Sequence, residues 1–143
     1  MFVRLSLSLL FFGVIACSTD PGVRTVTLEA NEGLIASDGT VVSDGSGLKS
    51  DLVAHKHSSS LDLKGGRFGT DYQPLHDFNR IKFDSLTDVP CTAPTDAEED
   101  NIFLLPEEGH GFTVRANKTS GYFRVWIKTM DVGMVTLDYE FCD

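Results

Sequence analysis

The sequence predicts an all-β domain: a small antiparallel β-sandwich or barrel closed by a C-terminal hairpin, with at most one short helical turn. Three observations predict it. Turn-forming residues recur every six to fifteen positions after the first 23 residues, short apolar runs lie between them, and the last two runs alternate between apolar and polar residues. This spacing is typical of strands joined by tight turns.

The turn signals mark the ends of the expected elements. They are Asn31-Glu32-Gly33, Asp38-Gly39, Asp44-Gly45, Gly65-Gly66, Gly109, Gly121 and Gly133. The strands expected between them are Arg24–Glu29, Thr40–Val42, Asp51–His55, Ser60–Lys64, Arg80–Asp84, Ile102–Leu105, Gly111–Ala116, Tyr122–Met130 and Met134–Phe141. The capping-box spacing from Thr95 to Glu98 predicts one helical turn, and the pattern of Leu75–Phe83 fits a helix or a strand.

The final hairpin allows a prediction of register. In both of its strands apolar residues occupy alternate positions, so each strand has one apolar face. The two faces coincide only if the loop has an odd number of residues, and Asp131-Val132-Gly133 meets that condition with Gly133 in the left-handed conformation. The resulting pairs are Ile127 with Leu137, Val125 with Tyr139, Phe123 with Phe141, Arg124 with Glu140 and Trp126 with Asp138.

The first sixteen residues have the pattern of an export signal. Arg4 lies in a short head, and the apolar stretch that follows, up to Ala16, is too short to span a bilayer. Residues 14–17 read Val-Ile-Ala-Cys and resemble the lipobox of bacterial lipoproteins. The resemblance implies cleavage after Ala16, a diacylglyceryl group on Cys17 and, in diderm bacteria, acylation of the new N-terminus. An ordinary signal peptide whose cleavage leaves a cysteine first is the alternative.

This resemblance divides the chain into a signal peptide (1–16), a lipidated cysteine with its tether (17–23) and a β-rich domain (24–143). It also implies a location in the bacterial cell envelope, with the membrane as a partner through the anchor, because two or three acyl chains bind a bilayer stably. Ser18 follows the cysteine, where an aspartate usually retains lipoproteins at the inner membrane in well-studied diderm lineages. The outer membrane is therefore favoured.

Cysteine count and charge narrow the prediction further. Lipidation of Cys17 leaves Cys91 and Cys142 of the three cysteines, and an oxidising compartment favours their disulfide. Such a bridge would stabilise the domain by about 4 kcal/mol in the chain-entropy account. Without the signal, 11 basic and 21 acidic residues remain, a net charge of −10. Nucleic acid is not an expected partner.

One row of residues is a candidate binding surface. In the predicted register Tyr122, Arg124 and Trp126 lie together on the polar face of the hairpin. Such a row suits stacking on a sugar ring or contact with a partner protein. The alternative is that another strand, a loop or the arm carrying the disulfide covers Trp126.

The histidines give a second candidate site. His55 and His57 are two apart, so on a strand they would share a face and both reach one metal ion, with His76 or His110 as a third ligand. Surface histidines in an exposed turn are the alternative, and no resident cofactor is predicted. The runs Gly111–Ala116, Gly121–Ile127 and Val135–Tyr139 resemble the terminal strands of small envelope lipoproteins such as the HmuY-type haem-binding group. The resemblance assigns no haem ligand, and it makes His55, His57, His76 and His110 candidate axial ligands.

These observations predict a non-catalytic lipoprotein of the cell envelope. No nucleophile elbow, metalloprotease motif, phosphate loop or dinucleotide fingerprint occurs in the sequence. The expected role is a binding or structural module for an envelope protein or a carbohydrate. The alternative is a carrier of haem or a metal ion that uses the histidines.

Overall fold

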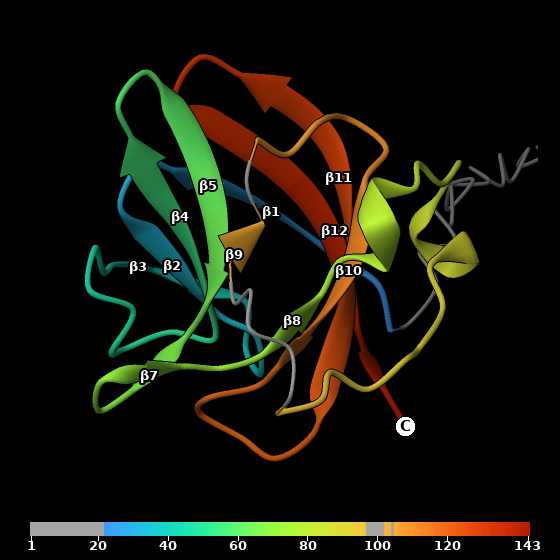
Figure 1. Cartoon of the computed structure of the whole chain (residues 1–143), viewed down its shortest axis with the longest axis horizontal. Helices are drawn as coiled ribbons and strands as arrows, with labels where there is room; N and C mark the ends of the chain where they lie inside the picture. Colours follow the sequence, from blue (N-terminus) through green and yellow to red (C-terminus); the bar gives the residue numbers. More distant parts are fainter. Residues whose placement is uncertain (1–21, 97–101, 104) are drawn as a thin grey trace, which may run out of the picture.

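The computed structural model describes residues 22–96, 102–103 and 105–143, and it is an all-β sandwich (Figure 1). Two five-stranded antiparallel sheets pack face to face, which confirms the predicted fold class and favours its sandwich form over a barrel. Within these residues no helix has the length and apolar character needed to cross a bilayer. The predicted signal peptide, Cys17 and most of the tether lie outside the described residues.

The first sheet, sheet A, contains the predicted hairpin at its centre. Its order is β1 (Arg24–Glu29), β12 (Met134–Cys142), β11 (Tyr122–Asp131), β10 (Gly111–Arg115) and β8 (Leu75–His76). The hairpin β11–β12 therefore forms the middle of a sheet, where it is hydrogen-bonded on both sides.

The second sheet, sheet B, is built from the first half of the chain and one later strand. Its order is β3 (Thr40–Ser43), β2 (Glu32–Ile35), β4 (Leu52–His57), β5 (Ser60–Gly65) and β9 (Ile102–Phe103). The short strands β6 (Arg67–Phe68) and β7 (Asp71–Tyr72) form a separate ribbon, and η1 (Phe78–Arg80) and η2 (Leu86–Asp88) are single turns of 3-10 helix.

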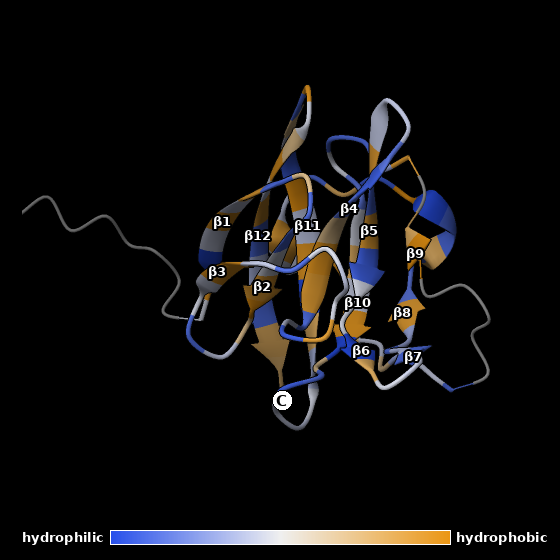
Figure 2. Ribbon diagram, turned by 90° about the vertical axis from the view of Figure 1, so that its left-hand side faces the viewer, coloured by the Kyte–Doolittle hydropathy of each residue, from blue (hydrophilic) through white to orange (hydrophobic). Residues whose placement is uncertain are grey.

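The core lies between the two sheets because alternate residues of each strand point inward. Figure 2 shows the apolar residues concentrated on the strands and the polar ones on most of the connecting loops. The largest fully buried side chains are Tyr139, Phe103, Phe112, Phe123, Leu28, Leu34, Leu52, Leu63, Ile127 and Leu137. They come from both sheets, so burial of apolar surface holds the sheets together.

The hairpin register agrees with the prediction up to Ile127, but the predicted loop is wrong. Pairing from Tyr122 to Ile127 follows the expected register, and it then shifts by one residue. A β-bulge at Lys128 absorbs the extra residue, so the loop is only Val132-Gly133, with Gly133 at φ 73°. A one-residue bulge with a two-residue loop leaves three residues unpaired, as a three-residue loop does. The alternation of apolar and polar residues therefore cannot distinguish the two.

The bulge changes which residues of β11 face the core. Thr129 was expected on the apolar face, yet it is exposed, and Met130 packs against the core instead. The two residues opposite them on β12, Thr136 and Val135, keep their predicted faces. The bulge therefore keeps an apolar residue opposite Val135.

Other predicted elements are corrected by local hydrogen bonds. Arg80–Asp84 is not a strand: η1 occupies its start, and Lys82 makes only an isolated bridge to His110. The Asp77 carboxylate accepts the Asn79 N–H at 2.8 Å, and such a side-chain contact competes with strand pairing.

The other changes concern one missed strand and two uncertain segments. The turn expected at Asn31-Glu32-Gly33 is shorter, because Glu32 already begins the unpredicted strand β2. The ambiguous segment Leu75–Phe83 contains a two-residue strand followed by η1. The helical turn expected from Thr95 to Glu98 ends outside the described residues.

A buried carboxylate ties the two sheets at one end of the sandwich. Asp51, which is fully buried, accepts the Ala36 N–H at 2.8 Å and the N–H groups of Asn117 and Lys118, each at 2.7 Å. Ala36 follows β2 in sheet B, whereas Asn117 and Lys118 lie in the loop between β10 and β11 in sheet A. One side chain therefore satisfies donors from both sheets.

Candidate functional site

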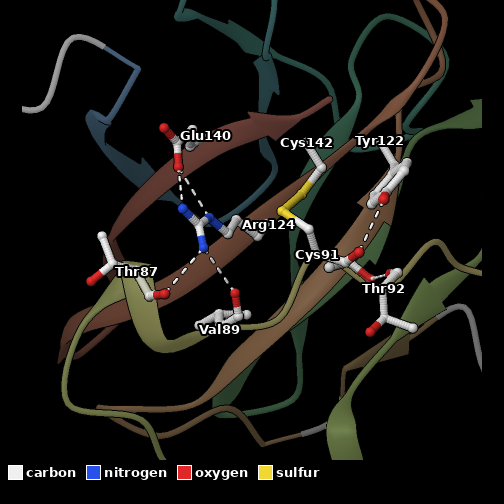
Figure 3. The surroundings of a disulfide bond; sticks show 9 residues. Thr87, Val89, Cys91, Thr92, Tyr122, Arg124, Glu140 and Cys142 are labelled. Atoms are coloured by element: carbon white, nitrogen blue, oxygen red, sulfur yellow. Dashed lines mark hydrogen bonds and ion pairs between the residues drawn. A yellow bond between two sulfur atoms is a disulfide. The ribbon is translucent and has the colours of Figure 1, made fainter.

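An arm of the chain crosses the outer face of sheet A. We define this arm as residues 77–96, between β8 and the undescribed residues 97–101 (Figure 3). The face beneath it is formed by the outward residues of β10 and β11. These are Gly111, Thr113, Arg115, Tyr122, Arg124 and Trp126.

Side chains of this face donate hydrogen bonds to backbone carbonyls of the arm. The pairs are Trp126 Nε1 to Phe83 O at 2.9 Å, Arg124 Nη1 to Thr87 O at 3.2 Å and Val89 O at 3.0 Å, Tyr122 Oη to Cys91 O at 3.0 Å, Thr113 Oγ1 to Thr92 O at 2.6 Å and Arg115 Nη2 to Pro94 O at 2.9 Å. The arm has no strand partner for most of its carbonyls, and these side chains satisfy them instead.

A close packing contact at Gly111 and an ion pair of Arg124 also position the arm on sheet A. A Cβ at Gly111 would lie 2.5 Å from Val89 Cγ2 and 2.7 Å from the Phe83 ring, so only glycine lets the arm lie this close. The Arg124 guanidinium also reaches Glu140 on the next strand, with Nε and Nη2 at 3.0 and 2.5 Å from Oε2 (Figure 3). Arg124 therefore connects β12, β11 and the arm.

A disulfide fastens the same arm covalently. Cys91 of the arm and Cys142 at the end of β12 form the bond, with their Cα atoms 5.7 Å apart (Figure 3). They are 51 residues apart in the chain, and Tyr122, which binds Cys91 O, is the strand partner of Cys142. The arm is thus fixed at the end of sheet A where the chain terminates.

The three residues of the predicted binding surface do share one face, but they differ in what covers them. Arg124 and Trp126 lie under the arm and are engaged by its carbonyls. Tyr122 lies at the end of the sheet, where its half-buried side chain also lines an open groove. The alternative that the arm carrying the disulfide covers Trp126 is therefore correct. Tyr122 is the residue of the row that borders an open groove.

Two grooves share Arg115 in their lining, and Tyr122 lines the smaller one. The smaller, of about 240 Å³, includes Tyr122, Ala93, Pro94, Thr119 and Ser120. The larger, of about 510 Å³, includes Thr70, Asp71, Tyr72, Gln73 and Asp96. Sequence reasoning missed Arg115 and Tyr72 here. Strand alternation places Arg115 on the polar face of the predicted strand Gly111–Ala116, but no sequence signal places Tyr72 beside it.

His55 and His57 lie on β4 and face outward from sheet B, as their spacing predicts. His57 Nδ1 is 3.6 Å from Oδ2 of Asp62, a buried carboxylate of β5. His55 Nδ1 is buried without a hydrogen-bond partner, and burial, aided by the nearby Lys64 charge, lowers the pKa of His55. Among the described residues, no group of three or more His, Cys, Asp or Glu side chains is arranged to hold a metal ion.

The two histidines offered as third ligands lie elsewhere. His76 belongs to β8 of sheet A, and its ring packs edge-on against Phe78 at 4.5 Å. His110 is buried beside the Phe103 ring, and its Nδ1 accepts the Glu107 N–H at 3.0 Å. Burial lowers the pKa of His110, which favours the neutral ring that this hydrogen bond requires.

Comparison of the chain with protein-family profiles, curated proteins and solved structures gives no significant match. The fold and the site therefore define its class by themselves. The described residues form an all-β sandwich that contains the Cys91–Cys142 disulfide, and an arm of the same chain covers the β10–β11 part of one outer face.

Proposed function

We propose that this chain is a lipid-anchored protein of the bacterial cell envelope, at the outer membrane, and that its sandwich is a non-catalytic binding module for an envelope protein or a carbohydrate. The disulfide carries the argument. It engages Cys91 and Cys142, so Cys17 is the one cysteine left for lipid, and it stands in the lipobox sequence ahead of the sandwich.

The arrangement of the chain ends suits such an anchor. The sandwich begins at Arg24, seven residues after Cys17, and Gly22 lies against Glu140 near the end of β12. A tether of six residues would hold this end of the domain close to the bilayer. Tyr122 and the grooves lie at this same end, because Tyr122 is paired with Cys142.

Fatty-acid labelling tests the anchor. The chain, expressed in a diderm bacterium with labelled palmitate, should carry the label and partition into detergent, and Cys17→Ser should abolish both. The double variant Cys91→Ala/Cys142→Ala is the matched control and should keep the label. If Cys17→Ser still carries label or fractionates with membranes, the proposed anchor is wrong.

A haem or metal carrier is the second candidate, favoured by the buried unpartnered His55 Nδ1 and by the His57–Asp62 pair. Absorbance and metal content of the purified chain distinguish the two. A haem band or stoichiometric zinc that disappears in His55→Ala/His57→Ala would establish the carrier. A colourless chain without stoichiometric metal after incubation with haemin or Zn²⁺ would exclude it.

A further inference from the structure

We propose that the two grooves at Arg115 form one binding site for a neutral oligosaccharide, with Tyr72 and Tyr122 as stacking surfaces and Arg115 between them. The inference rests on the proposed function, since it names the ligand class of the binding module. It also moves the site: the predicted row gave Tyr122 as its first residue, and the site now extends from Tyr122 past Arg115 toward β7 rather than along the covered residues Arg124 and Trp126.

Arg115 lines both grooves. It is the last residue of β10 and points to the outer face, where its side chain is 37% exposed. Its Nη2 donates to Pro94 O at 2.9 Å, and its Nη1 forms an ion pair with Asp96. These contacts fix the plane of the guanidinium before any ligand arrives, which lowers the entropic cost of binding.

The two tyrosines are also fixed. Tyr122 donates its hydroxyl proton to Cys91 O at 3.0 Å, next to the disulfide. Tyr72 is half-buried in β7, and Lys64 Nζ and Arg67 Cζ lie over its ring, 5.1 Å and 6.0 Å from the centroid. In the proposed site a sugar stacks on the part of the Tyr72 ring that these two cations leave uncovered. Rigid, partly exposed aromatic rings provide apolar area at a small entropic cost, and the C–H faces of a pyranose ring match that area.

Part of the remaining lining is polar and suits hydroxyl groups. Gln73, Thr119 and Ser120 each supply both a donor and an acceptor, as a sugar hydroxyl does. The Thr70 hydroxyl donates to Asp71 Oδ1 at 3.3 Å and supplies an acceptor. The larger groove, of about 510 Å³, is of a size usual for small-ligand sites. The apolar residues of the lining are small or cyclic (Pro74, Ala93, Pro94 and Ala116), and none is a large aliphatic side chain, which makes a lipid or an apolar peptide a poor fit.

Charge selects a neutral saccharide over an acidic one. Asp96 already compensates Arg115, and Asp71 adds a negative charge to the larger groove. The whole chain has a net charge of −9, so its field repels polyanions. An oligosaccharide of uronic acids would meet this repulsion with no uncompensated cation in the groove lining.

Calorimetric titration of the full chain tests the site. The chain is held in a zwitterionic detergent, because a maltoside or glucoside detergent would compete, and it is titrated with maltohexaose, cellohexaose, the N-acetylglucosamine hexamer and hexagalacturonate. At least one neutral hexamer should bind at a 1:1 ratio with a dissociation constant below about 1 mM. Hexagalacturonate should bind more weakly than that hexamer.

Variants separate stacking from a structural role. Tyr72→Ala and Tyr122→Ala should each weaken binding at least about tenfold. Tyr122→Phe keeps the ring and removes only the hydrogen bond to Cys91 O, so its affinity should stay within about threefold. Phe68→Ala is the control, since Phe68 is 76% exposed on the neighbouring strand β6 and lines neither groove. It should bind as the wild-type chain does.

Three results would overturn the proposal. They are no heat of binding from any neutral hexamer at about 10 mM, tighter binding of hexagalacturonate, or unchanged affinity in both alanine variants. None of these results bears on the lipid anchor, because labelling of Cys17 is measured independently. A chain that incorporates palmitate but binds no hexamer would keep its place in the envelope and lose this ligand.

Discussion

Part of the outer face of each sheet is covered, and the two covers are built in different ways. On sheet A, the arm is a distant segment, held by side chains of the sheet that donate to its carbonyls and by the Cys91–Cys142 disulfide. On sheet B, the local loop 44–50 covers the outer face around Gly33, and it is organised around the buried carboxylate of Asp44. This carboxylate accepts hydrogen bonds from the Ser46 hydroxyl at 2.9 Å, the Lys49 N–H at 2.8 Å and the Ser50 hydroxyl at 2.6 Å.

The two covers depend on the amino-acid sequence in different ways. The loop on sheet B needs particular side chains that are close together in the chain. It also needs a glycine beneath it, because a Cβ at Gly33 would lie 2.2 Å from Ser50 Oγ. The arm on sheet A offers mainly carbonyls, which every residue has, so its own side chains are freer. We expect the loop to be sensitive to single side-chain changes and the arm to depend on its covalent link.

Removal of the disulfide should have the largest effect and should weaken only the cover on sheet A. Cys91→Ala/Cys142→Ala should lower the free energy of unfolding by roughly 2 to 4 kcal/mol, since the bridge closes a long loop in the unfolded chain. Urea unfolding measures this. Mass spectrometry of the unreduced wild-type chain should show a mass two hydrogens lower than the reduced one, and two titratable thiols in the folded chain would refute the bond.

Asp44→Ala should have the next largest effect and should act on sheet B. It leaves the Lys49 N–H and the Ser50 hydroxyl without an acceptor in a buried place, at a cost of roughly 2 to 3 kcal/mol. Asp84→Ala is the control, because Asp84 is exposed, and it should change stability by less than about 0.5 kcal/mol. Equal urea midpoints for the two variants would show that the loop on sheet B does not depend on its carboxylate.

A matched pair of glycine substitutions compares the two covers directly. Gly33→Ala would push against Ser50 Cβ, which is close to the backbone and has little freedom to move, and should cost roughly 2 to 3 kcal/mol. Gly111→Ala meets the ends of the Val89 and Phe83 side chains, which can shift, and should cost roughly 1 to 2 kcal/mol. Thermal or urea unfolding ranks them, and the reverse order would contradict the proposed difference between the covers.

The smallest expected effect is a pH dependence that belongs to sheet B. Burial alone would raise the pKa of Asp44, but the hydrogen bonds from Ser50, Lys49 and Ser46 outweigh it and hold this pKa below 3.8. The unfolded chain therefore binds the proton first. The contribution of Asp44 to stability is complete above pH 3.8 and is lost as pH falls through its folded pKa.

Asp44→Asn removes this titration. Its free energy of unfolding should fall less steeply below pH 4 than that of the wild-type chain, by at most about 1.4 kcal/mol per pH unit. Urea unfolding at several pH values measures the two slopes. Parallel slopes would mean that Asp44 does not titrate differently in the folded state.

Two features of the sequence account for its correct predictions: the alternation of apolar and polar residues in the hairpin, and the number of cysteines. The apolar positions of the hairpin fixed the pairs from Phe123 to Ile127, because a slip of one residue would expose the whole face. The cysteine count indicated that Cys91 and Cys142 pair, as they do in the structure. Neither signal distinguishes a bulge at Lys128 from a longer loop, since both leave the apolar pattern unchanged before Ile127.

The sequence could not predict the two covers or the grooves, and the reason is physical. Trp126 and Arg124 could be placed on the polar face, but the carbonyls they bind lie 43 and 35 residues away in the chain and belong to residues of no particular type. Tyr72 and Arg115 line one groove, and the Arg115 N–H donates to the carbonyl of Pro74, two residues after Tyr72, at 3.1 Å. Tertiary contacts between a side chain and a backbone carbonyl leave no periodicity in the sequence.

The central claim is that the arm covers the β10–β11 part of the outer face of sheet A, and the single tryptophan of the chain reports on it. Trp126 Nε1 donates to Phe83 O, so its indole proton is shielded while the arm is seated. Because there is one tryptophan, the indole N–H gives one resonance in a ¹⁵N-labelled sample. Its hydrogen exchange should be at least about a hundredfold slower than in the urea-unfolded chain. Exchange at the unfolded rate under native conditions would show that the arm does not cover this face.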